Sequence, residues 1–438
     1  MDASLETLEL NESVDETTDV CDEKNHEVGY RDILKQKEFM KEILSLIVNR
    51  FGDAVDAIAS SWIVYELTGN AAWSAIIYAM NTLPTVFITP FAGAFVENKN
   101  KKLVIVISDF IRALCVGYIA TAYLMGFLQG WHLIITTLII STVEAFSTPA
   151  STAITPQILD KEYYDYGLSL EGSVSTVVEL IGIGAAAGII AFLGTGGAIY
   201  IDMATFIIAG LIYLTIKTKK VKNEDASFNS KEYIETLKEG FKYAVNKKVV
   251  LFICIVACFL NGILVPINSL QAPFISEVLG AGAGALSVIG ICVTGSMIVG
   301  SILYPIIRKH VSGRGIIICG GVAIALFYLG LIAFKPLYSN VYIMYTVLAI
   351  VTILLGGACA IASSFASVEF LKIVDEEYLS RAGAIFAALT VAMNPVISLI
   401  LSFLSSFLSV AVIFAIAGVI AVIASVFLAM SKSLKELD

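Results

Sequence analysis

The sequence predicts an all-α membrane protein with twelve transmembrane helices in two six-helix halves. Of its 438 residues, 58% are hydrophobic and 15% are charged, which is more apolar surface than soluble cores can bury. The apolar residues form runs of about 20 or more, the length that a helix needs to cross a bilayer. Basic residues gather in alternate loops between these runs. Together these features exclude a soluble enzyme with a membrane anchor.

Twelve hydrophobic segments follow one another along the chain. Each is predicted to be a helix, because backbone groups in lipid need hydrogen-bond partners and the runs are far longer than a barrel strand of roughly ten residues. The segments are residues 43–66, 72–96, 103–126, 132–156, 168–193, 197–217, 248–272, 283–306, 314–334, 340–368, 382–404 and 409–430.

The order of these segments divides the chain into five parts. We expect an acidic disordered cytoplasmic tail at residues 1–38 and an N-terminal six-helix bundle at 39–216. A cytoplasmic linker with an amphipathic helix follows at 217–247, then a C-terminal six-helix bundle at 248–431 and a short cytoplasmic tail at 432–438.

The first part carries the charge of the whole chain. Residues 1–30 hold ten carboxylates against the single Lys24, which accounts for the net charge of −9. This segment has neither a basic start nor an apolar stretch, so it is not expected to be a cleaved signal peptide. Its composition is typical of a disordered tail. The remaining residues are electrically balanced, and nothing in them indicates binding to nucleic acid.

The orientation follows from the lysines and arginines. One set of loops holds Lys99, Lys101 and Lys102, the nine lysines from Lys217 to Lys248, and Arg308, Lys309 and Arg314, whereas the intervening loops hold only Lys335. This bias predicts that both termini and the linker are cytoplasmic. Within the linker, SKEYIETLKEGFKYAVNKK has the apolar spacing of a helix that lies on the membrane surface. A plain solvated linker is the alternative.

A short internal repeat supports two equivalent halves. The segment from Gln157 to Tyr163 recurs from Lys372 to Tyr378, at an offset of 215 residues, and each copy lies between the fourth and fifth predicted helices of its half. The alternative is that both copies are merely a common helix-start pattern.

Charged residues inside the spans cost about 2.5–3.5 kcal/mol each on insertion scales, so each one needs a reason. Asp53 and Asp56 in the first span, Glu144 in the fourth and Glu179 in the fifth are the candidate proton-coupling residues. Two further pairs lie three residues apart and could neutralise each other on one helix face, Arg50 with Asp53 and Asp109 with Arg112. For Glu144 the alternative is a polar group that bonds to a neighbouring helix.

The second half offers neutral polar groups at depth. Asn261, Asn268 and Gln271 lie in the seventh span, and together with Arg50 they are the candidate substrate-cavity residues. This asymmetry predicts that one half handles protons while the other shapes the pocket. Aromatic residues such as Trp62, Tyr65, Tyr78 and Phe146 would suit a hydrophobic ligand, although aromatic residues in spans more often only pack.

Two stretches of the first half resemble a known family. FGDAVDAIASSWIVYELTG at residues 51–69 and GAFVENKNKKLVIVISDFIRA at 93–113 are similar to the major facilitator superfamily, and most to its macrolide-efflux-like drug exporter branch. The resemblance implies alternating access, in which two bundles rock about a site near the middle of the bilayer. It also implies that Asp53 corresponds to the aspartate that the family carries in its first span.

The resemblance further implies a cytoplasmic gate. The family's loop signature is retained at Gly93, Lys101 and Lys102, while Glu97 replaces its aspartate and Asn98 its arginine. The other expected gate residues are Asp109, Arg112 and Arg381. The fifth span reads GIGAAAG at Gly182–Gly188 and lacks the usual proline of the antiporter signature, but its small residues permit close helix approach.

The sequence indicates no enzyme and no cofactor. Cys254 and Cys258 lie in an apolar run without further ligands nearby, so packing is expected rather than metal binding. The GAGAG run at Gly280–Gly284 lacks the lysine of a phosphate-binding loop, so no nucleotide is expected.

The expected partners are a small-molecule substrate, protons and the lipid bilayer of the cell membrane. The predicted function is proton-coupled export of a hydrophobic or amphipathic compound. Import of a small nutrient and the flipping of a lipid or lysolipid are the alternatives.

Overall fold

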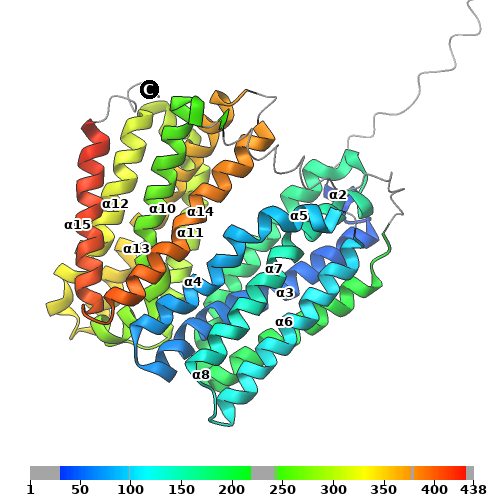
Figure 1. The fold of residues 1–438 in the computed structure, drawn as a ribbon, viewed down its shortest axis with the longest axis horizontal. Coiled ribbons are helices and arrows are strands. Elements are labelled where there is room, and N and C mark those ends of the chain that lie inside the picture. Colours follow the sequence, from blue (N-terminus) through cyan, green and yellow to red (C-terminus); the bar gives the residue numbers. More distant parts are fainter. Residues whose placement is uncertain (1–29, 98, 219–241, 244, 376–378, 431–438) are drawn as a thin grey trace, which may run out of the picture.

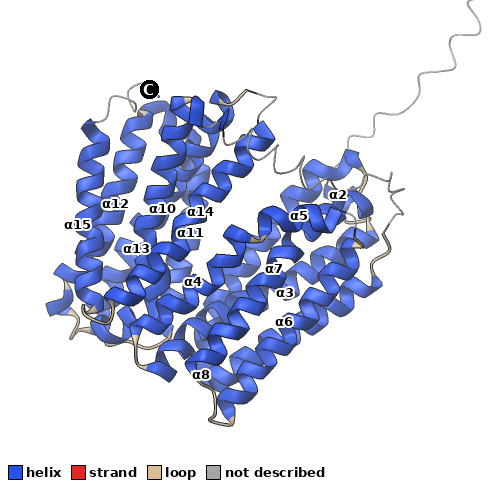
Figure 2. Ribbon diagram, in the orientation of Figure 1, coloured by secondary structure: helices blue, strands red, loops and turns tan. Residues whose placement is uncertain are grey.

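A computed structural model describes residues 30–97, 99–218, 242–243, 245–375 and 379–430. The described residues are helical, with short turns and no strand among them (Figure 2). Within the same residues, nine helices are long and apolar enough to cross a membrane. The predicted all-α class is therefore confirmed.

The first half of the chain forms one helical bundle, the N-bundle. Its helices end where the sequence supplies caps and breaks: Gly69 ends α3 in the left-handed region at φ +57°, and the Asn70 side chain accepts a hydrogen bond from the backbone N–H of Ala72 at the start of α4. Gly194, at φ +72°, divides the long α8 into two helices. The elements are α2 (Tyr30–Ile33), α3 (Lys37–Thr68), α4 (Ala71–Phe87), α5 (Thr89–Glu97), α6 (Lys101–Leu124), α7 (Gly130–Ile158), η1 (Lys161–Tyr163) and α8 (Tyr164–Thr215).

The second half forms the C-bundle. Ser312 caps α12 and Asn340 caps α13 with their side-chain oxygens, which explains where these helices begin. The elements are α10 (Lys248–Phe274), η2 (Ile275–Leu279), α11 (Gly284–His310), α12 (Gly313–Ala333), η3 (Lys335–Leu337), α13 (Val341–Ile373), α14 (Leu379–Leu404) and α15 (Val410–Met430).

These elements correspond to the twelve predicted segments. The second segment, 72–96, consists of α4 and α5, and the fifth and sixth are the two parts of α8. Helices α3 and α4 are not among the nine candidate spans because α3 carries several charged residues and α4 has only 17. That every one of the twelve segments crosses the bilayer stays a prediction.

The two bundles meet at one end and diverge toward the other, where α2, α5 and the last turn of α15 lie (Figure 1). Helix α4 packs against α14 and α10, and α8 packs against α11. We call the end with Tyr65 and Glu277 the closed end, because a hydrogen bond of 3.0 Å joins the bundles there. We call the opposite end, with Lys102 and Lys247, the basic end.

The outer surface of both bundles is apolar. Large side chains such as Phe192, which is 91% exposed, and Leu114, Tyr342 and Phe427 face outward. A surface of this kind is expected to contact lipid tails rather than water.

Two predicted parts of the chain fall largely outside the described residues. Most of the acidic tail precedes residue 30, but α2 lies within the predicted tail and buries Ile33 against Phe39 of the N-bundle. Most of the predicted amphipathic linker helix also lies outside the described residues, which in that region include Tyr243 and Lys247.

Candidate functional site

A buried arginine lies at the centre of the N-bundle. Arg112 on α6 is 8% exposed, and its Nη2 atom is 2.9 Å from Oδ1 of Asp53 on α3. Its guanidinium also lies over the ring of Phe206 on α8, 4.0 Å from the ring centroid. The ion pair and the ring contact fix this cation between three helices.

More carboxylates surround Arg112 than it can pair with. Its charge interacts with Asp109 of its own helix, with Glu144 on α7 and with Asp202 on α8, besides Asp53. Asp109 and Asp202 are each only 1% exposed. Among the described residues, Oδ2 of Asp109 has no hydrogen-bond partner. We name Asp53, Asp109, Arg112, Glu144 and Asp202 the acidic cluster.

A glycine makes room for part of this cluster. A Cβ atom on Gly52 of α3 would overlap the Thr205 hydroxyl of α8 and would lie 2.6 Å from Oδ1 of Asp202. Because Gly52 has no side chain, Asp202 can lie against α3 at the position that precedes Asp53. Asp202 in turn accepts a 3.4 Å hydrogen bond from Thr205.

The ion pair at Arg112 differs from the two charge pairs that the sequence predicts within single helices. Arg112 forms its short ion pair with Asp53 across two helices, not with Asp109. Arg50 donates from Nε to the Ser175 hydroxyl of α8 at 3.1 Å, so it faces α8 rather than Asp53. The packing of α3 and α6 against α8 brings Asp53 to Arg112 and Ser175 to Arg50.

A first cavity opens beside the cluster within the N-bundle, with a volume of about 350 Å³. Asp53, Asp109, Arg112 and Glu144 line it. Arg50 lines it as well, and so do Glu42 and Glu171, which sequence reasoning did not single out. We call it the N-bundle cavity.

Glu42 was missed because α3 begins at Lys37, six residues before the predicted span. It is 3% exposed, and neither of its carboxylate oxygens accepts a hydrogen bond from another described residue, although Tyr213 lies close to it. A signal was present in the sequence: Glu42, Asn49, Asp53 and Asp56 recur at helical spacing and form a polar stripe on α3.

A second cavity, the interbundle cavity, lies between α3, α4, α6 and α7 of the N-bundle and α10 of the C-bundle. Its volume is about 540 Å³. Asp56 lines it and accepts a 2.8 Å hydrogen bond from Ser60. The predicted substrate residues Asn268 and Gln271 line it from α10. Its other polar lining residues are Ser61, Ser74, Tyr78, Asn81, Thr137 and Ser269.

The remaining predicted residues lie elsewhere. Asn261 lines a separate cavity of about 250 Å³ inside the C-bundle and donates a hydrogen bond to the Ala257 carbonyl. Glu179 is half-buried on α8 and lines neither the N-bundle cavity nor the interbundle cavity. The structure therefore does not bring the four predicted substrate residues into one site.

Of the predicted gate residues, Asp109 and Arg112 belong to the acidic cluster, whereas the others lie toward the basic end. Lys102 donates to the carbonyls of Leu214 and Ile216, 2.7 and 2.8 Å away, where α8 ends. A cation at this position stabilises the negative end of the helix dipole, within a single bundle. Gly93 on α5 faces Pro149 of α7. Glu97 ends α5, Lys101 begins α6 and Arg381 lies in α14.

The closed end holds contacts that join the bundles. The Tyr65 hydroxyl of α3 donates to Oε1 of Glu277 on η2 at 3.0 Å, and Tyr78 of α4 faces Asn268 of α10. Gly184, in the GIGAAAG run of α8, lies against Ile291 of α11 in the C-bundle. Gly182 of the same run lies against Ala54 of α3 within the N-bundle. The predicted close approach of helices at this run is confirmed at Gly182.

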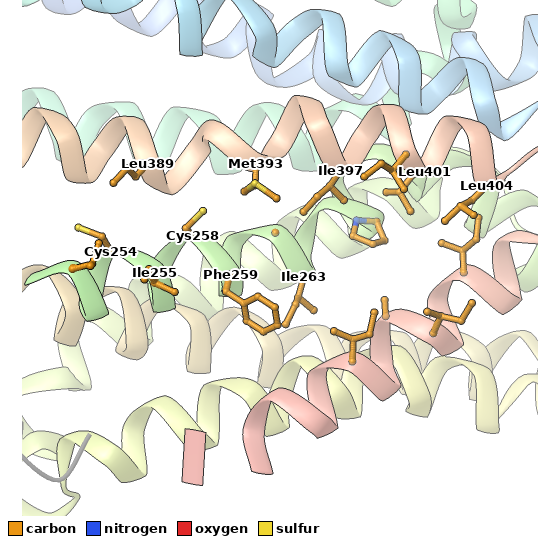
Figure 3. Close-up of a pocket in the computed structure, with 18 of the residues that line it drawn as sticks. Cys254, Ile255, Cys258, Phe259, Ile263, Leu389, Met393, Ile397, Leu401 and Leu404 are labelled. Atoms are coloured by element: carbon orange, nitrogen blue, oxygen red, sulfur yellow. The ribbon is translucent and has the colours of Figure 1, made fainter. Parts of the chain in front are cut away.

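A further cavity is an apolar groove of about 660 Å³ between α10, α14 and α15 (Figure 3). Cys254, Cys258 and Met393 line it together with aliphatic side chains, as Figure 3 shows. Since it offers no carboxylate and no cation among its described lining residues, it is not the candidate site for ion coupling.

The comparisons with known proteins agree with this architecture. A family model described as Major Facilitator Superfamily matches residues 43–371. The chain is 24% identical to the MFS-type transporter YvqJ of Bacillus subtilis over 56% of this chain and 59% of that protein. It is 21% identical to macrolide efflux protein A of Streptococcus pyogenes over 59% of this chain and 65% of that protein. The chain therefore spans about three fifths of these two relatives. The structure of the nucleoside transporter NupG superimposes with a TM-score of 0.73 at 15% identity, covering 90% of this chain and all of that one, which supports the fold alone.

Proposed function

The chain belongs to the major facilitator superfamily, and we propose that it exports a hydrophobic or amphipathic small molecule in exchange for protons. The observation that carries the proposal is the acidic cluster. One arginine there, already paired with Asp53, faces the buried Asp109 and Asp202 and the more exposed Glu144.

Such a cluster favours proton exchange. Each uncompensated charge at the centre of a bilayer costs about 2.5–3.5 kcal/mol on insertion scales, so the surplus carboxylates are stabilised by binding protons. Asp53 and Glu144 also line the N-bundle cavity, through which protons and water can reach them. In this structure Asp53 is half-buried and Glu144 is exposed. A carboxylate that is accessible in one conformation and covered in the other suits a coupling site.

The two bundles supply the conformational change. In alternating access, the closed end opens while the basic end closes, around sites near the middle of the membrane. The acidic cluster lies in the interior of the N-bundle, and the interbundle cavity lies where the two bundles meet. The excess of lysine and arginine at the basic end supports a cytoplasmic position for that end in the cell membrane.

Export is supported by the relative that is named a macrolide efflux protein. The test uses inside-out vesicles from cells that make the full chain, with labelled erythromycin and labelled ethidium as probes. We expect probe uptake when the vesicle interior is made acidic, and loss of uptake when an ionophore collapses the pH gradient. Vesicles from cells without the protein are the control. Probe movement in the same direction as protons would replace the proposal by import.

A further inference from the structure

The apolar groove of the C-bundle lies between two helices that follow each other in the chain. Among the described residues, α10 packs against both α14 and α15, whereas α14 and α15 make few contacts with each other. The space between them is therefore backed by α10. Figure 3 shows the labelled side chains of α10 and those of α14 on two sides of this space.

The described lining of the groove is entirely apolar, without a charged, hydroxyl or amide side chain. Several of its large side chains stay exposed in the folded chain, among them Ile255 at 57% and Ile400 at 51%. Leaving such a groove empty or filled with water is unfavourable, because its lining then lacks contacts or stays hydrated. Inside a bilayer the material that can fill it is an acyl chain.

The groove is long enough to hold an acyl chain of one leaflet. Its lining runs from Leu251 to Pro266 on α10 and from Leu389 to Leu404 on α14. At about 1.5 Å per residue, each of these walls is about 22 Å long. One leaflet supplies half of the roughly 30 Å hydrocarbon core, or about 15 Å. A chain that enters at one end can therefore lie in the groove along its full depth in that leaflet.

A lysine lies at the basic end of the groove. Val245 lines the groove, and residues 242–243 and 245–246 are helical. Lys242 precedes Val245 by three residues, so both side chains lie on one face of this helical turn. Lys242 is exposed and forms no ion pair with another described residue, whereas Lys247 pairs with Asp375 at 3.1 Å. The ammonium group of Lys242 can therefore meet an anionic group of a ligand.

The closed end of the groove has no such cation among its described residues. Residues 405–409, which follow the groove wall of α14, are three serines, a phenylalanine and a leucine. The nearby charged group is the carboxylate of Glu277, which lines one cavity together with Ser405 and Ser409. A phosphate would be repelled there and attracted at Lys242, so the charges select the leaflet at the basic end.

We propose that this groove binds an anionic phospholipid of the leaflet at the basic end, with one acyl chain along the groove and the phosphate beside Lys242. The lipid contacts α14, the C-bundle helix that packs against α4 of the N-bundle. It is a resident partner rather than the exported molecule, and the inference holds whichever way the substrate moves.

The test uses photoactivatable lipids and the purified full chain in phosphatidylcholine nanodiscs. Phosphatidylglycerol and phosphatidylcholine carry the same diazirine-labelled acyl chain, and mass spectrometry of the digested protein locates the label. We expect label on groove residues such as Cys258 and Met393, with a preference of about fivefold for phosphatidylglycerol. That preference is the effect of one lysine near a membrane surface.

Lys242→Gln tests the contact with the phosphate. This change at an exposed position should lower the preference for phosphatidylglycerol to nearly none. Lys309→Gln removes another exposed lysine, in the last turn of α11, and should leave the preference unchanged. Equal labelling by the two lipids, or a preference that Lys242→Gln does not alter, would overturn the inference.

A matched pair of tryptophan variants on α15 tests the acyl chain. Ile416 lines the groove and Val422 does not, and they are 43% and 42% exposed. Ile416→Trp should lower the labelling of Met393 about fivefold or more, whereas Val422→Trp should leave it unchanged. The melting temperature checks that both variants are folded, and Lys242→Gln tests the inference without any change in packing. Label spread evenly over the outer surface, and unaffected by Ile416→Trp, would indicate lipid that only surrounds the protein and would overturn the inference.

Two further probes distinguish the occupant. A fatty acid with the same diazirine-labelled chain should label the groove less than phosphatidylglycerol does, and ethidium should not displace the phospholipid. Labelling by the fatty acid that equals that of phosphatidylglycerol would assign the groove to free fatty acids. Displacement by ethidium would make the groove a substrate site. Either result would overturn the inference.

Discussion

Arg112 of α6 and Asp53 of α3 form an ion pair across two helices, with 2.9 Å between Nη2 and Oδ1. Asp53 lines the N-bundle cavity, and Asp56, one turn further along α3, lines the interbundle cavity. The two aspartates of one helix thus serve two cavities. Arg112 forms its ion pair with the first of them, whereas the second accepts a 2.8 Å hydrogen bond from Ser60.

The acidic cluster holds one cation and four carboxylates, and this imbalance predicts how substitutions in it change the free energy of unfolding. Arg112→Leu should lower the free energy of unfolding by about 3–5 kcal/mol, because it leaves several buried carboxylates without a counter-charge. Asp53→Asn should cost less, since other carboxylates still surround the arginine. The melting temperature of purified protein in detergent measures both.

The double variant Arg112→Leu with Asp53→Asn is the control for the arginine. It removes one of the unpaired acids and should recover part of the lost stability. Equal melting temperatures for Arg112→Leu and Asp53→Asn would show that the arginine does not neutralise the cluster.

The close approach at Gly52 gives a packing prediction. Gly52→Ala should destabilise the N-bundle by about 1–3 kcal/mol, because the added methyl group overlaps the Thr205 hydroxyl and crowds Asp202. Gly172→Ala in α8 is the matched control, since a Cβ there meets nothing within 4 Å. It should be neutral or slightly stabilising through helix propensity. Indistinguishable melting temperatures for the two variants would contradict the packing.

The Tyr65–Glu277 hydrogen bond should bias the protein toward the conformation with the closed end shut. Tyr65→Phe removes the donor but keeps the ring, and the loss of about 1 kcal/mol should shift the balance of the two conformations roughly fivefold. Spin labels at the exposed Phe127 and Phe407, in a chain without native cysteines, report this balance by double electron–electron resonance.

Trp62→Phe, a change on the same helix, is the comparison for Tyr65→Phe. A distribution of label distances that Tyr65→Phe leaves unchanged would show that the hydrogen bond does not hold the closed end.

A pH dependence is expected at the basic end of the C-bundle. Hydrogen bonds from the Tyr243 hydroxyl, at 2.8 Å, and from Lys247, at 3.1 Å, lower the pKa of Asp375 below its usual value. A lowered pKa means that the charged aspartate stabilises the fold at neutral pH and that this stabilisation is lost as the pH falls through the lowered value.

Asp375→Asn should therefore reduce the melting temperature at pH 7, and the difference from the wild type should shrink below about pH 4. Tyr243→Phe, which keeps the lysine, should give an intermediate loss. A difference that grows as the pH falls would have the wrong sign for this account.

The fold could be predicted from the sequence because it follows from the lengths and periods of apolar runs. Even the division of α8 coincides with the gap between the segments 168–193 and 197–217, where Gly194 permits the turn. The family was recognisable as well, from the stretch around Asp53 and the loop after Gly93.

The site was less predictable because pairing depends on geometry between helices. Spacing along one helix suggested Arg50 with Asp53, but only the packing of α3 and α6 against α8 brings Arg112 to Asp53 and Arg50 to Ser175. Likewise, the family's loop signature assigns Lys102 to a cytoplasmic gate, yet in the structure its side chain contacts the end of α8 in its own bundle. Whether it also acts in gating stays a prediction.

The most direct test of proton-coupled export records protons and substrate together. Proteoliposomes that contain the full chain and a trapped pH dye receive a substrate gradient with no initial pH difference, with labelled ethidium as the probe. We expect the dye to report proton movement opposite to the probe. Glu144→Gln and Asp53→Asn should abolish this proton movement while the probe still binds. Probe transport without proton movement, or with protons in the same direction, would contradict the account.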